Sequence, residues 1–195
     1  MTTYEAYAEG MAVPGHGHAV RAKLRINSVG LWLFFLSEAF LFSALLAARF
    51  YLAGTDKPEE LSQELGLGIT SILLLSSLTA FSAEVAMSKG RRGLAVLMLV
   101  ATITLGIVFF AGVVYEWSSA EFSQGESYGT AFFTMTGLHA SHVVSGVGIL
   151  TMLLVMVARG KFSPDSYWGF EAGIKYWHFV DVVWVFYYPA LYLIR

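Results

Sequence analysis

Histidines and carboxylates at helical spacing are the residues of this chain best suited to chemistry in apolar surroundings. His178 and Asp181 are three residues apart in residues 176–184 (YWHFVDVVW), and His139 and His142 are three apart in residues 132–146 (FFTMTGLHASHVVSG). Side chains at this spacing share one face of a helix. Each pair could therefore help to ligate a metal ion or haem, or could hydrogen-bond to neighbouring groups inside a membrane.

A single carboxylate, Glu38, lies in the middle of the apolar residues 32–40 (WLFFLSEAF). An ionised carboxylate in such surroundings needs a partner, and without one it stays protonated. We interpret Glu38 as a lipid-, proton- or partner-related site rather than as a plain helix–helix hydrogen bond. Glu84 and Glu116 fall near the ends of apolar runs, where their side chains can reach headgroup water.

The composition indicates a membrane protein. Of the 195 residues, 56% are hydrophobic and 13% are charged, whereas a soluble domain carries about 25% charged residues. The net charge of −2 gives no reason to expect nucleic-acid binding. The lack of cysteine excludes disulfides, iron–sulfur clusters and thiolate-bound copper.

Five apolar runs are long enough to cross a bilayer, which takes about 20 residues in a helix. They cover residues 28–53, 66–88, 93–117, 128–158 and 171–194. This pattern predicts an all-α fold, a polytopic bundle of five transmembrane helices in residues 28–195. Residues 1–27 are predicted to form a polar cytoplasmic tail, which contains His16 and His18.

The basic residues predict the orientation of the bundle, because cytoplasmic loops carry an excess of Lys and Arg. Most of the 12 basic residues precede the first run, lie in the second or fourth connection, or lie near the start of the fifth run. These are Arg21, Lys23, Arg25, Lys89, Arg91, Arg92, Arg159, Lys161 and Lys175. We therefore expect the N-terminus inside and the C-terminus outside.

The intramembrane histidines are interpreted as structural groups. Polar side chains in membranes commonly hold helices together, and two histidines on one helix cannot lie on opposite faces of one haem. His178 and Asp181 are interpreted as a buried pair in which each group satisfies the other; alternatively, Asp181 fixes the tautomer of a ligating His178. A haem–copper catalytic centre needs more histidine ligands than His139, His142 and His178 can supply.

Four segments, in order along the chain, resemble the motifs of one known family. They are residues 37–38 (SE), 104–106 (TLG) followed by Glu116, 132–146, and 168–184. The last contains WGFE and YWHFVDVVW, which are similar to the wording of the family's final helix, and residues 132–146 resemble its T-G-F-H-G-x-H-V motif. The family is subunit III of cytochrome c oxidase, and the resemblance extends over all five predicted spans.

This resemblance implies a support role in a terminal oxidase. Subunit III of the family binds no redox metal, and haem and copper belong to the partner subunits of the complex, the catalytic subunit I and subunit II. It packs against the catalytic subunit, holds phospholipid in a V-shaped cleft and helps to sustain proton uptake during turnover. A five-helix form is known in bacterial oxidases, which implies a multi-pass protein of the bacterial plasma membrane.

Carried over to this sequence, the resemblance makes Glu38 the carboxylate that faces the cleft. It also places His139 or His142 close enough to hydrogen-bond to Glu38. No residue of this chain is assigned as catalytic, cofactor-binding or metal-binding. The expected structural polar anchors are His178, Asp181 and Glu116.

Other functions remain open at this point. Subunit III of a quinol oxidase is closely similar, although YWHFVDVVW favours cytochrome c as the electron donor. A small haem-b carrier would use His139, His142 and His178. A small transporter would use Glu38 and Asp181 as proton carriers, but the sequence lacks the internal repeat that many transporters have.

Overall fold

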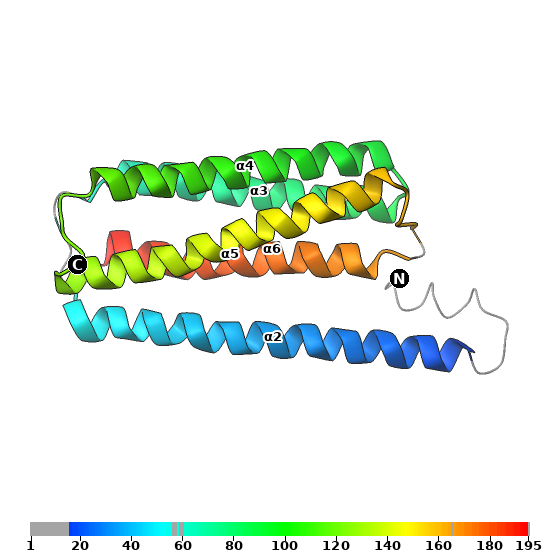
Figure 1. The fold of residues 1–195 in the computed structure, drawn as a ribbon, viewed down its shortest axis with the longest axis horizontal. Coiled ribbons are helices and arrows are strands. Elements are labelled where there is room, and N and C mark those ends of the chain that lie inside the picture. Colours follow the sequence, from blue (N-terminus) through cyan, green and yellow to red (C-terminus); the bar gives the residue numbers. More distant parts are fainter. Residues whose placement is uncertain (1–15, 56–57, 59–60, 165, 195) are drawn as a thin grey trace.

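Five long helices lie alongside one another in the computed structural model (Figure 1). The structure describes residues 16–55, 58, 61–164 and 166–194, with side chains from residue 24 onward. The helices are α2 (His16–Ala53), α3 (Gln63–Ser88), α4 (Arg92–Ser119), α5 (Ser127–Ala158) and α6 (Trp168–Tyr188), and a π-helix, η1 (Pro189–Leu193), follows α6. The described residues contain no strand, so the predicted all-α bundle is confirmed.

Four helices of the described chain are long and apolar enough to cross a membrane. They are α3, α4, α5 and the Leu24–Ala53 part of α2. The fifth, α6, is less apolar because it carries Glu171, Lys175 and Asp181 within 21 residues. It packs against α2, α3 and α5, so neighbouring helices cover much of its surface. Polar groups at membrane depth normally face protein in this way.

The first helix begins earlier than the sequence predicts. We expected a polar tail through residue 27, whereas α2 starts at His16, directly after Pro14 and Gly15. Proline and glycine oppose helix interiors, while the Ala, Arg, Lys and Leu residues that follow favour them. Charged residues can extend a helix beyond the apolar core, so the hydrophobic run marks the membrane rather than the helix end. The side chains of His16 and His18 lie outside the described part.

Glycines at positive φ follow three of the described helices, and the first of them is Gly54 after α2. Gly90 (φ 69°) follows α3, and Gly160 (φ 70°) follows α5. The next backbone N–H groups, of Arg91 and Lys161, donate back to the carbonyl oxygens of Ala86 and Met156 at 2.9 and 3.0 Å. This satisfies carbonyls that a helix end leaves open and permits the short reversals between consecutive helices.

Two tryptophans of α6 fill the interior of the bundle. Trp177 and Trp184 are fully buried, and their indole N–H groups donate to Ser76 Oγ (3.0 Å) and Thr70 Oγ1 (2.9 Å) of α3. A buried indole needs such an acceptor. These bonds fix the rotation of α6, and with it the faces on which its histidine and carboxylates lie.

Candidate carboxylate–histidine site between α2 and α5

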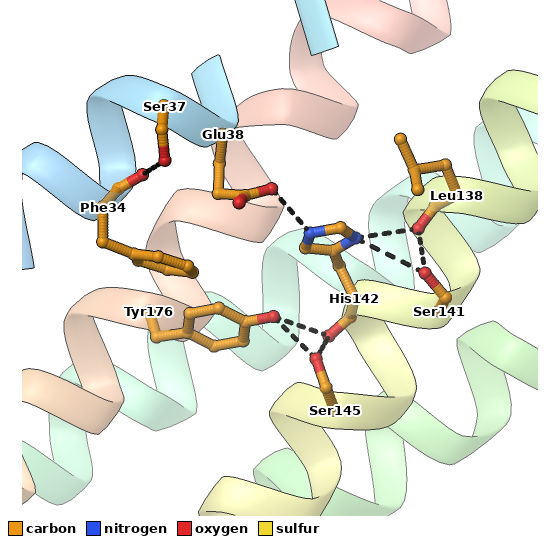
Figure 2. Close-up of polar contacts among 8 residues, drawn as sticks. All are labelled: Phe34, Ser37, Glu38, Leu138, Ser141, His142, Ser145 and Tyr176. Atoms are coloured by element: carbon orange, nitrogen blue, oxygen red, sulfur yellow. Dashed lines mark hydrogen bonds and ion pairs between the residues drawn. The ribbon is translucent and has the colours of Figure 1, made fainter. Parts of the chain in front are cut away.

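Glu38 of α2 and His142 of α5 face each other across the boundary between these helices (Figure 2). Oε2 of Glu38 lies 3.1 Å from Nε2 of His142, and the two side chains keep only 20% and 15% of their exposure. A contact between Glu38 and one of the two α5 histidines was expected from the resemblance. The structure has this contact, and His142 makes it.

The surroundings of His142 limit where hydrogens can sit. Its Nδ1 lies 2.9 Å from the carbonyl oxygen of Leu138, and a carbonyl can only accept, so Nδ1 carries a hydrogen. The bond between Nε2 and Glu38 then needs one further proton. That proton lies either on the carboxyl group, beside a neutral ring, or on the ring, beside a carboxylate. The pair can therefore pass one proton between its members without a change in net charge.

Tyr176 of α6 and Ser145 of α5 brace the backbone beside His142. Tyr176 Oη lies 2.6 Å from Ser145 Oγ, and Ser145 Oγ donates to the carbonyl oxygen of His142 at 2.8 Å. The Tyr176 ring stacks on Phe34 of α2, with centroids 6.1 Å apart (Figure 2). Sequence reasoning did not assign Tyr176. Its position at the start of YWHFVDVVW was the only available signal.

An apolar groove of about 340 Å³ lies between α2 and α6 beside this pair. Its lining includes Ala39, Phe42 and Leu46 of α2 and Phe179 and Phe186 of α6. Phe42 links the groove to the pair, because its ring also meets the His142 ring edge-on at 4.8 Å. The groove is therefore apolar enough for a hydrocarbon chain, and it lies close to the Glu38–His142 pair.

His139 lies apart from Glu38 and binds α6 instead. It is fully buried, with Nε2 3.1 Å from the carbonyl oxygen of Val180, so this nitrogen donates. Its ring packs against those of Phe109 and Trp184. Within the described residues, no three His, Cys, Asp or Glu side chains form a group that could hold a metal ion.

Comparison with known proteins identifies the family. The family model for cytochrome c oxidase subunit III matches residues 4–194. The chain belongs to the cytochrome c oxidase subunit III family. "Cytochrome c oxidase subunit 3" of Neurospora crassa is 39% identical over 199 residues, which cover 95% of this chain and 72% of that protein. The protein of the same name from Gallus gallus is 38% identical over 176 residues (84% and 67%), and that of Danio rerio is 35% identical over 197 residues (94% and 74%).

Membership in the cytochrome c oxidase subunit III family places this chain among the accessory subunits of haem–copper oxidases. It is therefore a multi-pass membrane protein and part of a multi-subunit oxidoreductase complex. The remaining predicted residues, His178, Asp181 and Glu116, lie away from the Glu38–His142 pair.

In this subunit III chain, His178 makes its hydrogen bond to α3 rather than to Asp181. Its Nδ1 lies 2.8 Å from Ser77 Oγ, whereas Oδ2 of Asp181 is 3.8 Å from the same nitrogen. That distance is too long for a hydrogen bond but close enough for an ion pair. Asp181 is 3% exposed, and neither of its carboxyl oxygens has a hydrogen-bond partner within the described residues. Sequence reasoning missed Ser77, because nothing local distinguishes it from the other serines of α3.

Glu116 lies inside the bundle and not in headgroup water, although it is near the end of α4. It is 4% exposed and accepts a 2.6 Å hydrogen bond from Tyr192 Oη of η1. Tyr128 Oη donates to the carbonyl oxygen of Leu191 at 2.7 Å. The fully buried Arg49 lies over the Tyr128 ring, 4.8 Å from its centroid. Sequence reasoning did not single out Arg49, since its position near a helix end resembles that of an exposed residue.

Proposed function

We propose that this chain is the non-redox accessory subunit III of a proton-pumping haem–copper terminal oxidase in a bacterial plasma membrane. It packs against the catalytic subunit I, which together with subunit II holds the haem and copper, and the complex takes electrons from cytochrome c. The observation that carries the proposal is the Glu38–His142 pair beside an apolar groove. This site combines a proton-exchanging group with a place for lipid.

Lipid binding is supported by a second groove, of about 410 Å³, at the N-terminal end of α2. Arg25 and Ser28 line one part of it, and Trp32, Leu33 and Leu36 line the rest. Guanidinium groups bind phosphate well, and tryptophan is frequent where membranes meet water. A phospholipid fits here with its phosphate at Arg25 and an acyl chain along Trp32 and Leu36.

The proton role is supported by the hydrogen-bond pattern of His142. Since the Leu138 carbonyl can only accept, the hydrogen on that side is assigned to Nδ1, and the Nε2–Glu38 contact then holds one proton, on the ring or on the carboxyl group. Groups of this kind, which lie within the membrane span and keep 15–20% of their exposure, can take up and release a proton inside the complex. The subunit would in this way support proton supply and the lifetime of the oxidase while haem and copper in its partners carry the electrons.

The proposal is tested by comparing the complete oxidase with the same complex stripped of this chain. We expect both preparations to oxidise reduced cytochrome c at similar initial rates. The depleted complex should then lose activity within fewer turnovers, and adding the chain back with phospholipid should restore the lifetime. Equal lifetimes with and without the chain would contradict the support role, and oxidation of quinol alone would contradict the proposed donor.

A further inference from the structure

One face of α6 is not covered by the other described helices of this chain, and it includes a histidine. Lys175, His178, Val182 and Val185 are spaced by three, four and three residues, which places them on one side of the helix. The side chains of Lys175 and His178 are 39% and 31% exposed, and Val182 and Val185 are 53% and 45% exposed. We call these four residues the His178 face.

His178 lies close to the middle of the membrane. It is ten residues into α6, which corresponds to about 15 Å along the helix, or about half of a 30 Å hydrocarbon core. Its partner Ser77 lies at a similar depth in α3, eleven residues before the end at Ser88. The imidazole therefore cannot reach headgroup water from this position.

Only one side of the His178 ring is satisfied within the chain. Nδ1 meets Ser77 Oγ at 2.8 Å, with Asp181 3.8 Å away. Nε2 makes no hydrogen bond to any described residue. It is also not a fully buried atom, so it is open to the surroundings of the chain. A polar nitrogen open to hydrocarbon is costly, and such groups face protein or water instead.

We propose that the His178 face docks a transmembrane helix of another subunit of the oxidase, and that this helix brings a neutral hydrogen-bonding side chain (Ser, Thr, Asn or Gln) to Nε2 of His178. The inference rests on the proposed function, which makes this chain part of such a complex. An acyl chain offers no hydrogen bond, so lipid would leave Nε2 unsatisfied, whereas interhelical hydrogen bonds from small polar residues are common in membranes.

Charges around the face favour a neutral partner. Asp181 lies behind His178, and Glu84 of α3 interacts electrostatically with Glu171, Lys175 and His178. An acidic partner would add a further negative group to this region. A basic partner would bring its positive charge close to the middle of the membrane, where burying a charge is costly. A neutral side chain can meet Nε2 whichever nitrogen of the ring carries the hydrogen.

The chain contains no cysteine, so single cysteines can be introduced without background. In native membranes that contain the assembled oxidase, Val182→Cys is labelled with a benzophenone maleimide and photolysed, and adducts are identified by mass. The control is Val108→Cys on α4, where the valine is 45% exposed, close to the 53% of Val182. We expect Val182→Cys to give an adduct with one other subunit and Val108→Cys to give at least threefold less of it.

Two results would overturn the docking face. One is that Val182→Cys forms adducts with lipid alone although the subunits still copurify, which leaves the proposed function standing. The other is equal adduct yields from the two positions. Failure of the subunits to copurify in the unsubstituted complex would instead contradict the proposed function itself.

Substitution of His178 tests the hydrogen bond directly. His178→Ala should weaken retention of this chain in detergent-washed complex by about threefold, the usual effect of losing one interhelical hydrogen bond, and His178→Gln should recover part of it. Ser77→Ala removes only the internal bond and should leave the Val182→Cys adduct unchanged. Equal retention of the Ala, Gln and unsubstituted chains would contradict the role of Nε2.

Discussion

Nε2 of His142 meets Oε2 of Glu38 at 3.1 Å, although 104 residues separate them in the chain. The contact joins α2 to α5, and α2 is the helix least covered by the rest of the bundle: only 11% of its membrane-crossing window is buried. Figure 1 shows α2 along one edge of the bundle. The pair thus links the outlying helix to the bundle, and in the function proposed above it also exchanges a proton.

Glu38→Gln should separate these two roles. The amide keeps the size of the side chain and can still donate to Nε2 of His142, but it cannot exchange a proton. We therefore expect normal assembly and haem content of the oxidase with faster loss of activity during sustained turnover. Ser37→Ala is the control, because Ser37 Oγ bonds only to its own helix, at Phe34. Complete loss of activity from the first turnover would mean that Glu38 is more central than we propose.

His142→Leu should leave the Glu38 carboxyl group protonated. The substitution removes the only base within hydrogen-bond reach of Glu38 in the described structure, and a carboxylate without a partner is costly at membrane depth. Infrared spectra of the variant complex should show a carboxylic-acid C=O stretching band. That band should vanish in His142→Leu/Glu38→Gln. A spectrum without the band in the single variant would contradict our description of the pair.

Asp181→Ala should lower the yield of assembled complex. It removes the carboxylate that lies 3.8 Å from His178 Nδ1 and leaves a small cavity in the interior, and we expect a loss of about 0.5–3 kcal/mol in chain stability. Asp181→Asn, which preserves the volume of the side chain, should lower the stability of the chain by less. Yield is measured as the ratio of this chain to haem in membranes. A wild-type ratio for Asp181→Ala would argue against the anchor role assigned to this residue.

Gly146→Ala should disturb the packing of α5 on α6. An added Cβ would lie 2.8 Å from the Trp177 ring, in a place where the tryptophan is fixed by its bond to Ser76. Overpacking of this kind costs about 1–3 kcal/mol. Gly148→Ala, two residues on, meets no atom within 4 Å and serves as the matched control. Thermal denaturation of the complex should show a lower midpoint for Gly146→Ala only; equal midpoints would contradict the packing described.

Tyr192→Phe should loosen the C-terminal π-helix. The hydroxyl of Tyr192 donates to Glu116 at 2.6 Å in a buried site, and leaving that carboxyl oxygen without its donor costs about 1–3 kcal/mol. Hydrogen exchange of residues 189–193 should become faster in this variant. Tyr188→Phe removes a hydroxyl that bonds to no other described residue and should leave exchange unchanged. Identical exchange in both variants would show that the Tyr192–Glu116 bond does not hold η1.

Much of the fold was predictable because a helix that crosses the bilayer needs a long run of apolar residues, and such runs can be read from the sequence. The predicted runs 66–88, 93–117 and 128–158 fall within a few residues of α3, α4 and α5. The start of α2 was not predictable in this way. The residues before residue 28 favour a helix but are too polar to belong to the hydrophobic run. At the end of α6 the chain continues as the π-helix η1, which begins at Pro189.

The candidate site was only partly predictable. Spacing showed that His139 and His142 share a face, but the choice between them depends on the rotation of α5, which Trp177 and the glycines of α5 set through tertiary packing. Ser77, Tyr176 and Arg49 were missed for the same reason. Their partners lie on other helices, so no local pattern distinguishes these three side chains from ordinary ones.

The central claim is that this chain serves an oxidase without holding a redox centre itself. Its most direct test is affinity purification through a tag on this chain, with mass identification of the copurifying subunits and visible spectra before and after the chain is separated from them. We predict a haem-containing catalytic subunit in the complex and no Soret band in the separated chain. A Soret band that stays with the isolated chain, or purification without any haem-binding partner, would contradict the account.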